Sequence, residues 1–210
     1  MNMMRFTTMK TKLRKYPSIF LILLLAISSC FLTGCVNQHP KDSKKSSQGE
    51  SVETMLEITD PKEKQAVLNA KAKVKALSGN PRIVATSPAV ADICDKLDLD
   101  LVGVPKSSVS KIPSRYKKVK KVGLAMSPDM EIVSSLNPDW ILAPSSLETD
   151  LKPKFEELKN TEYAFLNLRS VQGMYRSAQE LGEIFGKQQE AEKMTKEFTT
   201  FYKSYTNEIK

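Results

Sequence analysis

Met126 is the residue of this 210-residue chain best placed to contact a bound molecule. It ends the apolar run Val122–Met126 and precedes Ser127-Pro128-Asp129, which predicts a helix start, since Ser is a favoured N-cap and Pro suits the first helical position. A methionine in a loop before a helix can offer its thioether, a soft and neutral metal ligand. From the residues alone, an apolar loop residue without that role is equally expected.

Cys35 is the second residue whose surroundings indicate chemistry. It closes Leu32-Thr33-Gly34-Cys35, which looks like a bacterial lipobox, a motif whose Cys receives a diacylglycerol and becomes the first residue of the mature protein. Before it come a basic segment without acidic residues and the apolar stretch Ile19–Leu32, which is too short for a comfortable membrane span. We expect residues 1–34 to be a lipoprotein signal peptide and Cys35 to carry lipid. An uncleaved signal anchor is the alternative.

The charge and cysteine counts narrow the function classes. The chain has 32 Lys and Arg against 24 Asp and Glu, and without the five basic residues of the signal the balance is 27 to 24, a net charge of +3. The high net charge is therefore no evidence for nucleic-acid binding. Removal of Cys30 and lipidation of Cys35 leave Cys94 alone, so no intramolecular disulfide is expected. Cys94 shares a helical face with Val90 and Leu97, which predicts a small core residue.

Residues 35–80 are predicted to hold the lipidated Cys, a polar tether and a short helix. Val36–Ser51 is rich in Ser and Lys and should be a flexible spacer. The single histidine, His39, lies there without a cluster of other ligands, so we interpret it as a solvated linker residue. Asp60-Pro61-Lys62-Glu63 resembles a capping box and predicts a helix to about Leu77. Its thin apolar content predicts loose packing and indicates no role.

Residues 81–186 are predicted to form an α/β lobe. Short apolar runs alternate with helical patterns of about ten residues, which indicates right-handed βαβ units and a parallel, Rossmann-like sheet. Such a sheet binds ligands beyond the carboxyl ends of its strands. The predicted strands are Arg82–Ala85, Leu101–Val104, Trp140–Ala143 and Tyr163–Leu166, and the predicted helices between them include Ala89–Leu97 and Leu151–Lys159.

Polar groups follow the first predicted strand at that edge. Thr86 and Ser87 supply hydroxyls, and the amides of Ala89 and Val90 lie at a helix N-terminus, where backbone N–H groups suit anions. Pro88 removes one amide from this set, which weakens it. The sequence therefore predicts an anion-binding corner after the first strand.

Two helices close the sequence. Val171–Phe185 carries one apolar stripe and is terminated by Gly186. Residues 187–210 carry a second stripe that includes Phe198, Phe201, Tyr202 and Tyr205. A wide aromatic stripe requires a cover, since exposed patches of this kind mark interaction surfaces.

Three groups of segments carry a resemblance to a known family. They are Arg82-Ile83-Val84 with Asp98–Gly103, then Ser134–Ile141, and last Ala178–Gly186 with Ala191-Glu192-Lys193. They resemble the N-terminal half of binding proteins that join two α/β lobes by a rigid helix and deliver haem, siderophores or cobalamin to ABC importers. The likeness is greatest to haem-receptor lipoproteins of Gram-positive iron-regulated surface uptake systems, through Asp95–Gly103, Pro113–Lys117 and Gly123–Pro128.

The resemblance implies site residues. In those haem receptors a Met of the first lobe and a His of the second ligate the iron, and Met126 stands where that Met stands. The propionates would then need the donors at Thr86, Ser87, Ala89 and Val90, and Lys111 from the basic loop Lys106–Lys121. Such a basic run is usually a solvated face, and attraction to anionic lipid is a further alternative.

The resemblance also implies partners. The family docks onto its permease through acidic residues of each lobe, and Glu148 and Asp150 lie in the matching region, although both could merely stabilise a helix start. We expect a lipid-anchored protein on the outer face of a Gram-positive cell membrane, working with an ABC permease and its ATPase and with upstream cell-wall haem-transfer proteins.

Other functions remain as alternatives. A siderophore or cobalamin binder of the same family is the nearest, and a non-functional truncated fragment is another, since no second lobe follows residues 187–210, the predicted start of the inter-lobe helix. An α/β enzyme is not expected, because the sequence has no GxGxxG or P-loop motif and no histidine placed as a base.

Overall fold

The computed structural model describes residues 5–6 and 56–208, which form part of one compact unit. Cys35, His39, the tether and all of the predicted signal peptide except Arg5–Phe6 lie outside the described residues. Within the described part, no helix combines the length and apolar character needed to cross a membrane.

Five parallel strands form the centre of the fold, in the order β8-β7-β2-β3-β4. The predicted parallel α/β sheet is confirmed. A two-residue strand, β1, pairs antiparallel with the outer edge of β8. The strands are β1 (Arg5–Phe6), β2 (Ile83–Ala85), β3 (Leu101–Val104), β4 (Lys120–Lys121), β7 (Trp140–Pro144) and β8 (Glu162–Leu166). Because β1 lies inside the predicted signal, cleavage there would remove it from the sheet.

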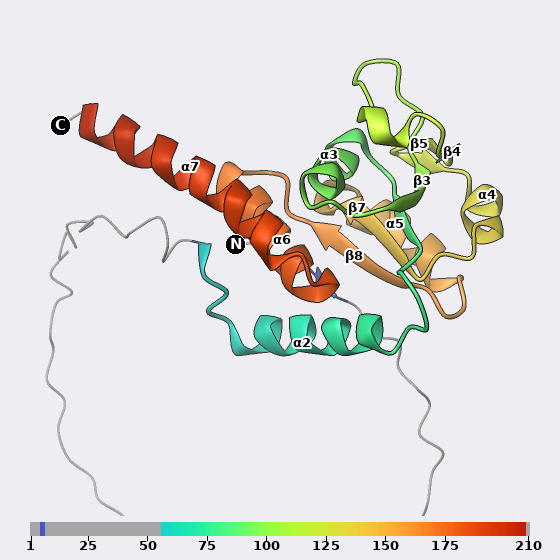
Figure 1. Ribbon diagram of the computed structural model, residues 1–210. Coiled ribbons are helices and arrows are strands. Elements are labelled where there is room, and N and C mark those ends of the chain that lie inside the picture. The colour runs from blue at the N-terminus through green and yellow to red at the C-terminus, as the bar shows by residue number, and fades with distance from the viewer. Residues whose placement is uncertain (1–4, 7–55, 209–210) are drawn as a thin grey trace, which may run out of the picture. The chain divides into compact units, whose positions relative to one another are not determined.

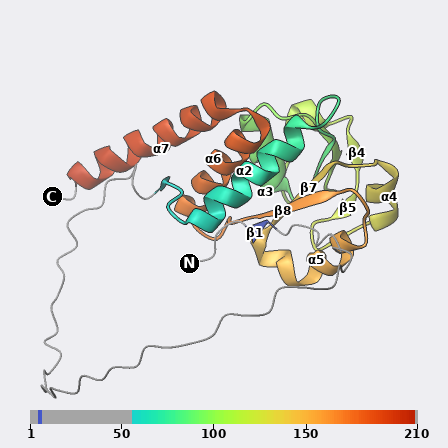
Figure 2. The same cartoon turned by 90° about the horizontal axis from the view of Figure 1, so that it is seen from below.

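The strands β2, β3, β7 and β8 are covered on both faces, which explains why they are almost continuous apolar runs, whereas the edge strand β4 consists of two lysines. Alternate residues point to opposite sides, so Leu142 and Ala164 enter one core cluster while Ile141 and Phe165 enter the other. Figures 1 and 2 show the sheet between two helical layers. The first cluster is covered by α2 (Pro61–Lys75), α3 (Pro88–Lys96), α6 (Val171–Phe185) and α7 (Gln188–Glu208), and the second by α4 (Met130–Ser135) and α5 (Glu148–Glu156).

Side-chain caps fix the helix starts. The side chain of Asp60 accepts a hydrogen bond from the amide of Lys62 at the start of α2, and the side chain of Ser170 accepts one from the amide of Gly173 at the start of α6. At the other end of α6, Gly186 has φ 71°, a left-handed conformation that favours glycine. These boundaries agree with the sequence prediction within two residues at each terminus.

The pair α6–α7 packs closely at its turn. A Cβ on Gly182 would lie 2.7 Å from the Cβ of Ala191, so only glycine permits this approach. Farther along, the rings of Tyr175 and Phe198 stack with centroids 4.6 Å apart. Phe185 meets Trp140 of β7 edge to face at 5.5 Å, which ties the helix pair to the sheet.

Helix α2 is bound more tightly than its sequence predicts, because its contact with α6 includes buried charges. Val67 and Ala70 enter the first core cluster, and Glu63 is buried against Arg176 with Oε2 to Nη2 at 3.1 Å. The prediction of loose packing was wrong, because the apolar content of α2 does not reveal that Glu63 is buried and paired with Arg176. At the surface, Lys71 and Lys73 pair with acidic residues of α6 and β8.

A second carboxyl group, that of Glu180 on α6, lies in the same buried cluster. It is 1% exposed, and burial together with the charge of Glu63 raises the pKa of Glu180 to about 9. Burial also raises the pKa of Glu63, which the positive charge of Arg176 partly offsets. One arginine thus faces two acids, and Glu180 is protonated at neutral pH.

Replacing Glu180 by Gln removes a group that takes up a proton on folding. Since the pKa is near 4.5 in the unfolded chain and about 9 in the folded one, the wild type should lose stability as pH rises between these values. We expect E180Q to resemble the wild type near pH 5 and to be more stable by roughly 1–3 kcal/mol near pH 9, in urea unfolding.

The control for this prediction is Glu192→Gln on α7, an exposed position that should leave the pH profile of the wild type unchanged. An E180Q profile parallel to that of the wild type would show that Glu180 is ionised in the folded protein.

Three local elements were not predicted. Lys120–Lys121 forms β4, and Gly123–Leu124 (β5) pairs with Ser127–Pro128 (β6) in a small antiparallel hairpin. The predicted helix start at Ser127 was wrong, because these residues extend into that hairpin. The N-cap of α4 is instead Asp129, whose carboxylate accepts from the amides of Glu131 and Ile132.

Candidate ligand-binding edge of the sheet

The strand order creates a topological switch point at the carboxyl edge of the sheet. In chain order the parallel strands lie as 3-2-1-4-5, so the chain reverses its direction of travel between β2 and β7. The helix after β2, α3, covers one face, while the helix after β7, α5, covers the opposite face. Parallel sheets bind ligands at such a switch point, beyond the ends of the two diverging strands.

The predicted anion-binding corner lies at this switch point, but three of its groups are engaged in hydrogen bonds within the protein. The hydroxyl of Thr86 donates to the carbonyl of Leu142 at 3.3 Å, and Ser87 Oγ accepts from the amide of Val90 at 3.3 Å. Thr86 and Ser87 are buried, whereas Ala89 is exposed on the first turn of α3. Its amide is thus the member of the predicted set best placed to meet a ligand, and the others position it.

Ser145, directly after β7, is a candidate that sequence reasoning missed. Its Oγ is buried and has no hydrogen-bond partner among the described residues. A buried hydroxyl without a partner carries a desolvation cost, which a ligand atom could relieve. Its position directly after the predicted strand Trp140–Ala143 and the strand-ending Pro144 was the available signal.

Met126 lies at the tip of the β5–β6 hairpin, with Ala125 in its two-residue turn. The hairpin continues from the carboxyl end of β4, at the same edge of the sheet as the switch point. The side chain is 73% exposed, whereas Met130, one turn into α4, packs against the second core cluster. Thus the thioether that could meet a ligand is that of Met126, and Met130 serves the core as predicted.

The base of the hairpin is closed, and joined to the loop after β3, by short backbone hydrogen bonds. The amide of Lys106 donates to the carbonyl of Gly123 at 2.6 Å, and that of Asp129 donates to Val122 at 2.7 Å. Gly123 has φ 97°, and a Cβ there would lie 2.9 Å from the Asp129 nitrogen. Glycine is therefore required for the geometry that presents Met126.

Substituting Gly123 by Ala should strain the hairpin, because a side chain would clash with backbone atoms at a positive φ. We expect G123A to lower the free energy of unfolding by about 1–3 kcal/mol, measured by urea denaturation. Gly79→Ala is the matched control, since a Cβ at Gly79 meets no atom within 4 Å. Equal effects of the two substitutions would contradict the role assigned to Gly123.

Lys111 is exposed in the long loop between β3 and β4. The loop is braced at its end by Arg115, whose guanidinium bonds to Asp98 at 2.7 Å and Asp100 at 2.8 Å. Lys187 also bonds to Asp98, and its hydrogen bond and that of Arg115 lower the pKa of this carboxyl. The 3-10 helix Ser114–Tyr116 follows the loop, and the buried hydroxyl of Tyr116 donates to Leu99. The brace holds the loop at the ligand edge.

Glu148 and Asp150 occupy the first turn of α5, after the 3-10 helix Ser145–Leu147 that follows β7. Asp150 is exposed and Glu148 is half-buried. Glu148 borders a cavity of about 350 Å³ that Ser145, Lys152 and Arg169 also line. Arg169, shortly after β8, is a second candidate anion partner that sequence reasoning missed, and its place after a predicted strand was the available signal.

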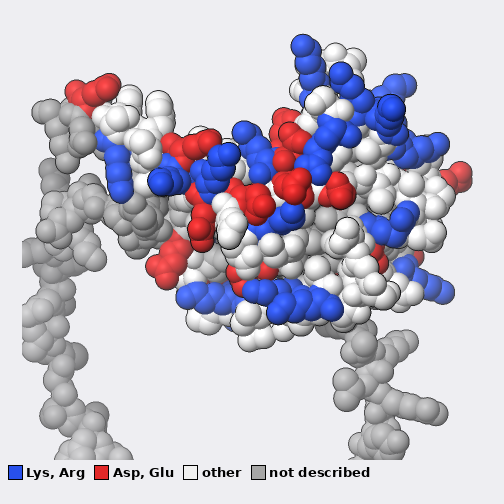
Figure 3. Space-filling view, in the orientation of Figure 1, with Lys and Arg blue, Asp and Glu red and all other residues white. Residues whose placement is uncertain are grey.

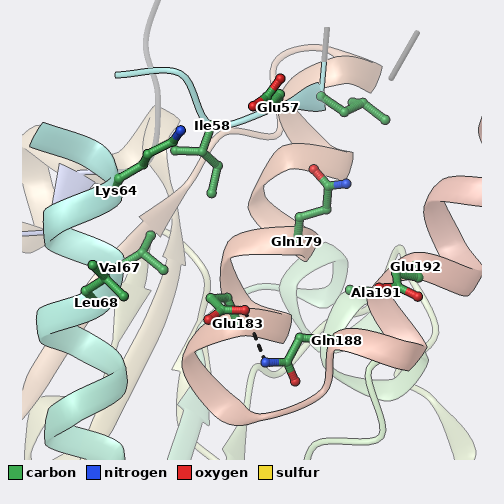
Figure 4. A pocket seen from close by; sticks show the side chains of 11 residues that line it. Glu57, Ile58, Lys64, Val67, Leu68, Gln179, Glu183, Gln188, Ala191 and Glu192 are labelled. Carbon is green, nitrogen blue, oxygen red and sulfur yellow. Dashed lines mark hydrogen bonds between the residues drawn. The ribbon is translucent and has the colours of Figure 1, made fainter. Parts of the chain in front are cut away.

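The larger cavity, of about 470 Å³, lies on the helical side of the lobe and contains none of the predicted site residues. Figure 4 shows it between α2, α6 and the start of α7, with the Gln188 amide donating to Glu183 at 3.1 Å. Its apolar walls are contributed by Leu56, Ile58, Val67, Leu68 and Ala191.

Cys94 is not a reactive group. It is fully buried in α3, and burial raises the pKa of its thiol to about 12, so it stays protonated at neutral pH. The prediction of a core cysteine is confirmed. Among the described residues, no group of three or more His, Cys, Asp or Glu side chains could hold a metal ion.

Residues 83–210 match the model of a family described as periplasmic binding protein. The chain belongs to this family. A curated relative, the high-affinity heme uptake system protein IsdE of Staphylococcus aureus (strain Newman), is 36% identical over 117 residues, which are 56% of this chain and 39% of that protein. The family resemblance drawn from the sequence is confirmed.

Two solved structures of the family share the fold. An ABC transporter substrate-binding protein from Listeria monocytogenes EGD-e is 44% identical, with a TM-score of 0.56, over 58% of this chain and 46% of the other. Staphylococcus aureus IsdE complexed with heme is 32% identical, with a TM-score of 0.58, over 62% of this chain and 50% of the other. Such proteins have two lobes, and the chain spans about half the length of these relatives.

Proposed function

We propose that this chain carries the N-terminal lobe of a substrate-binding protein that binds haem and delivers it to an ABC importer for iron acquisition. The observation that carries the proposal is Met126, a thioether held out at the ligand edge by a hairpin with glycine at its base. Similarity to a relative named as a heme uptake protein supports the choice of ligand.

Met126 would ligate the haem iron through sulfur, which suits a thioether because it is soft and neutral. Leu124, on the same hairpin and 58% exposed, offers apolar contact for the porphyrin ring. For the propionates, the amide of Ala89 and the ammonium of Lys111 are the donors. The hydrogen bonds of Thr86, Ser87 and Val90 stabilise the conformation of the loop before α3. Ser145 Oγ adds a further donor.

Replacing Met126 by Leu keeps the size and apolarity of the side chain and removes only the sulfur. We expect M126L to weaken haemin binding by at least about tenfold, since one iron ligand is lost, and to remove the Soret shift that sulfur ligation produces. The measurement is a visible absorption titration of residues 36–210 with haemin. The part is suitable because both core clusters are formed by residues 67–194.

Metal-free protoporphyrin is the matched probe, and Leu124→Ala is the matched variant. M126L should bind the metal-free ring as the wild type does, and L124A should keep the sulfur-dependent Soret shift. Haemin binding that is unaffected by M126L would remove Met126 from the site. The alternative ligands are tested by equilibrium dialysis with a ferric siderophore or cobalamin. Saturable binding of one of these, together with no binding of haemin, would assign the lobe to the alternative ligand class.

We further propose that Cys35 anchors the protein by lipid to the outer face of the cell membrane of a Gram-positive bacterium. Upstream cell-wall proteins would supply haem, and a permease with its ATPase would take it up. Glu148 and Asp150 would contact basic residues of that permease, because both lie on the first turn of α5 at the ligand edge.

Charge reversal tests this contact. E148K/D150K should bind permease-containing proteoliposomes at least about tenfold more weakly, since two attractive charges become repulsive, while haemin titration stays unchanged. Glu157→Lys, at an exposed position after the other end of α5, is the matched control. Unchanged permease binding by the double variant would leave the two acids the simpler role of stabilising the helix start.

A further inference from the structure

The loop between β3 and β4 and the neighbouring hairpin form a surface with one sign of charge, which we call the basic tip. Figure 3 shows blue side chains gathered over this end of the lobe. No acidic residue occurs between Pro105 and Pro128. The basic tip consists of Lys106, Lys111, Lys117, Lys118, Lys120 and Lys121 together with the apolar residues Val109, Leu124 and Met126.

The lysines of the basic tip are not neutralised. None of the six forms an ion pair within the part of the chain that the structure describes, whereas Lys71 and Lys73 on α2 both do. The neighbouring acids are engaged elsewhere. Asp98 and Asp100 bond to Arg115, and Asp129 caps α4. Five of the six lysines are exposed and Lys121 is half-buried, so the basic tip presents a cluster of unpaired positive charge to its surroundings.

Exposed apolar side chains stand among these charges. Val109, between Lys106 and Lys111, is 95% exposed, and Leu124 and Met126 are 58% and 73% exposed. Among the described residues these are three of the seven large hydrophobic side chains that are exposed. A merely solvated face gains nothing from such residues, so their concentration here indicates a partner with both negative charge and hydrocarbon.

We infer that the basic tip rests on the surface of an anionic phospholipid bilayer. Lysines near such a surface are attracted to its phosphate groups, and small apolar side chains enter the boundary between headgroups and acyl chains. An acidic protein partner would match the lysines but would leave Val109 without a reason to be exposed. Val109 has no part in the proposed haem site, so this part of the inference stands whichever ligand the lobe carries.

The consequence is an orientation. The basic tip includes the hairpin that follows the carboxyl end of β4, so contact with lipid would turn the ligand edge of the lobe toward the membrane. A lipid anchor alone sets only the distance from the bilayer, because a flexible tether permits every orientation.

The test is flotation of residues 36–210, which lack the lipid-bearing Cys35, with vesicles of phosphatidylglycerol and phosphatidylcholine in equal parts. We expect binding that falls with added salt, and little binding to pure phosphatidylcholine. K117E/K118E should weaken partition at least about 25-fold, at about fivefold for each lysine removed. At high salt the charges are screened, so Val109→Ser alone should lower the partition that remains through the apolar contact.

The matched control is K62E/K75E, which makes the same charge change at exposed positions of α2 and should alter partition much less. Equal loss in both double variants, equal binding to neutral vesicles, or no binding to anionic ones would overturn the inference. K117E/K118E leaves Met126 and Lys111 intact, so haemin titration of the same variant reports separately on the ligand site.

Discussion

A parallel sheet that must be buried on both faces is the constraint on which this lobe depends. Its four longer strands, β2, β3, β7 and β8, lie between helices on the two faces, so their side chains are almost wholly apolar. Polar chemistry is then confined to the ends of the strands. The strand order reverses between β2 and β7, which places the switch point at one of these ends, and the Met126 hairpin follows from the edge strand β4 at the same end.

Buried strands and capped helices could be predicted because each depends on local chemistry. Ile83–Ala85 and Trp140–Pro144 are continuous apolar runs, and Ser170 with Gly186 marks the two ends of α6. The hairpin of Ser127–Pro128 could not be predicted, since its pairing depends on the positive φ of Gly123 and on contacts with the sheet. The short strand β4 is made of two lysines, whose pattern predicts no strand.

The place of Thr86 and Ser87 in the fold was predictable from the sequence, and their hydrogen bonds were not. Thr86 and Ser87 follow the first parallel strand as predicted, but their hydroxyls are used within the protein, which only three-dimensional proximity to Leu142 and the geometry of α3 decide. The buried cluster of Glu63, Arg176 and Glu180 joins residues more than 110 positions apart in sequence. No local pattern marks such a pair, so the role of α2 became clear only in the fold.

Helix α7 has two halves of unequal stability. Ala191 and Met194 are buried in the core, whereas Phe201 and Tyr205 stack on each other, ring centroids 6.3 Å apart, largely exposed to solvent. Because the far half of the helix buries fewer apolar side chains than the near half, we expect it to open locally at a lower free energy. Any surface that covers those rings therefore orders the helix as it binds, and part of the binding energy is spent on that ordering.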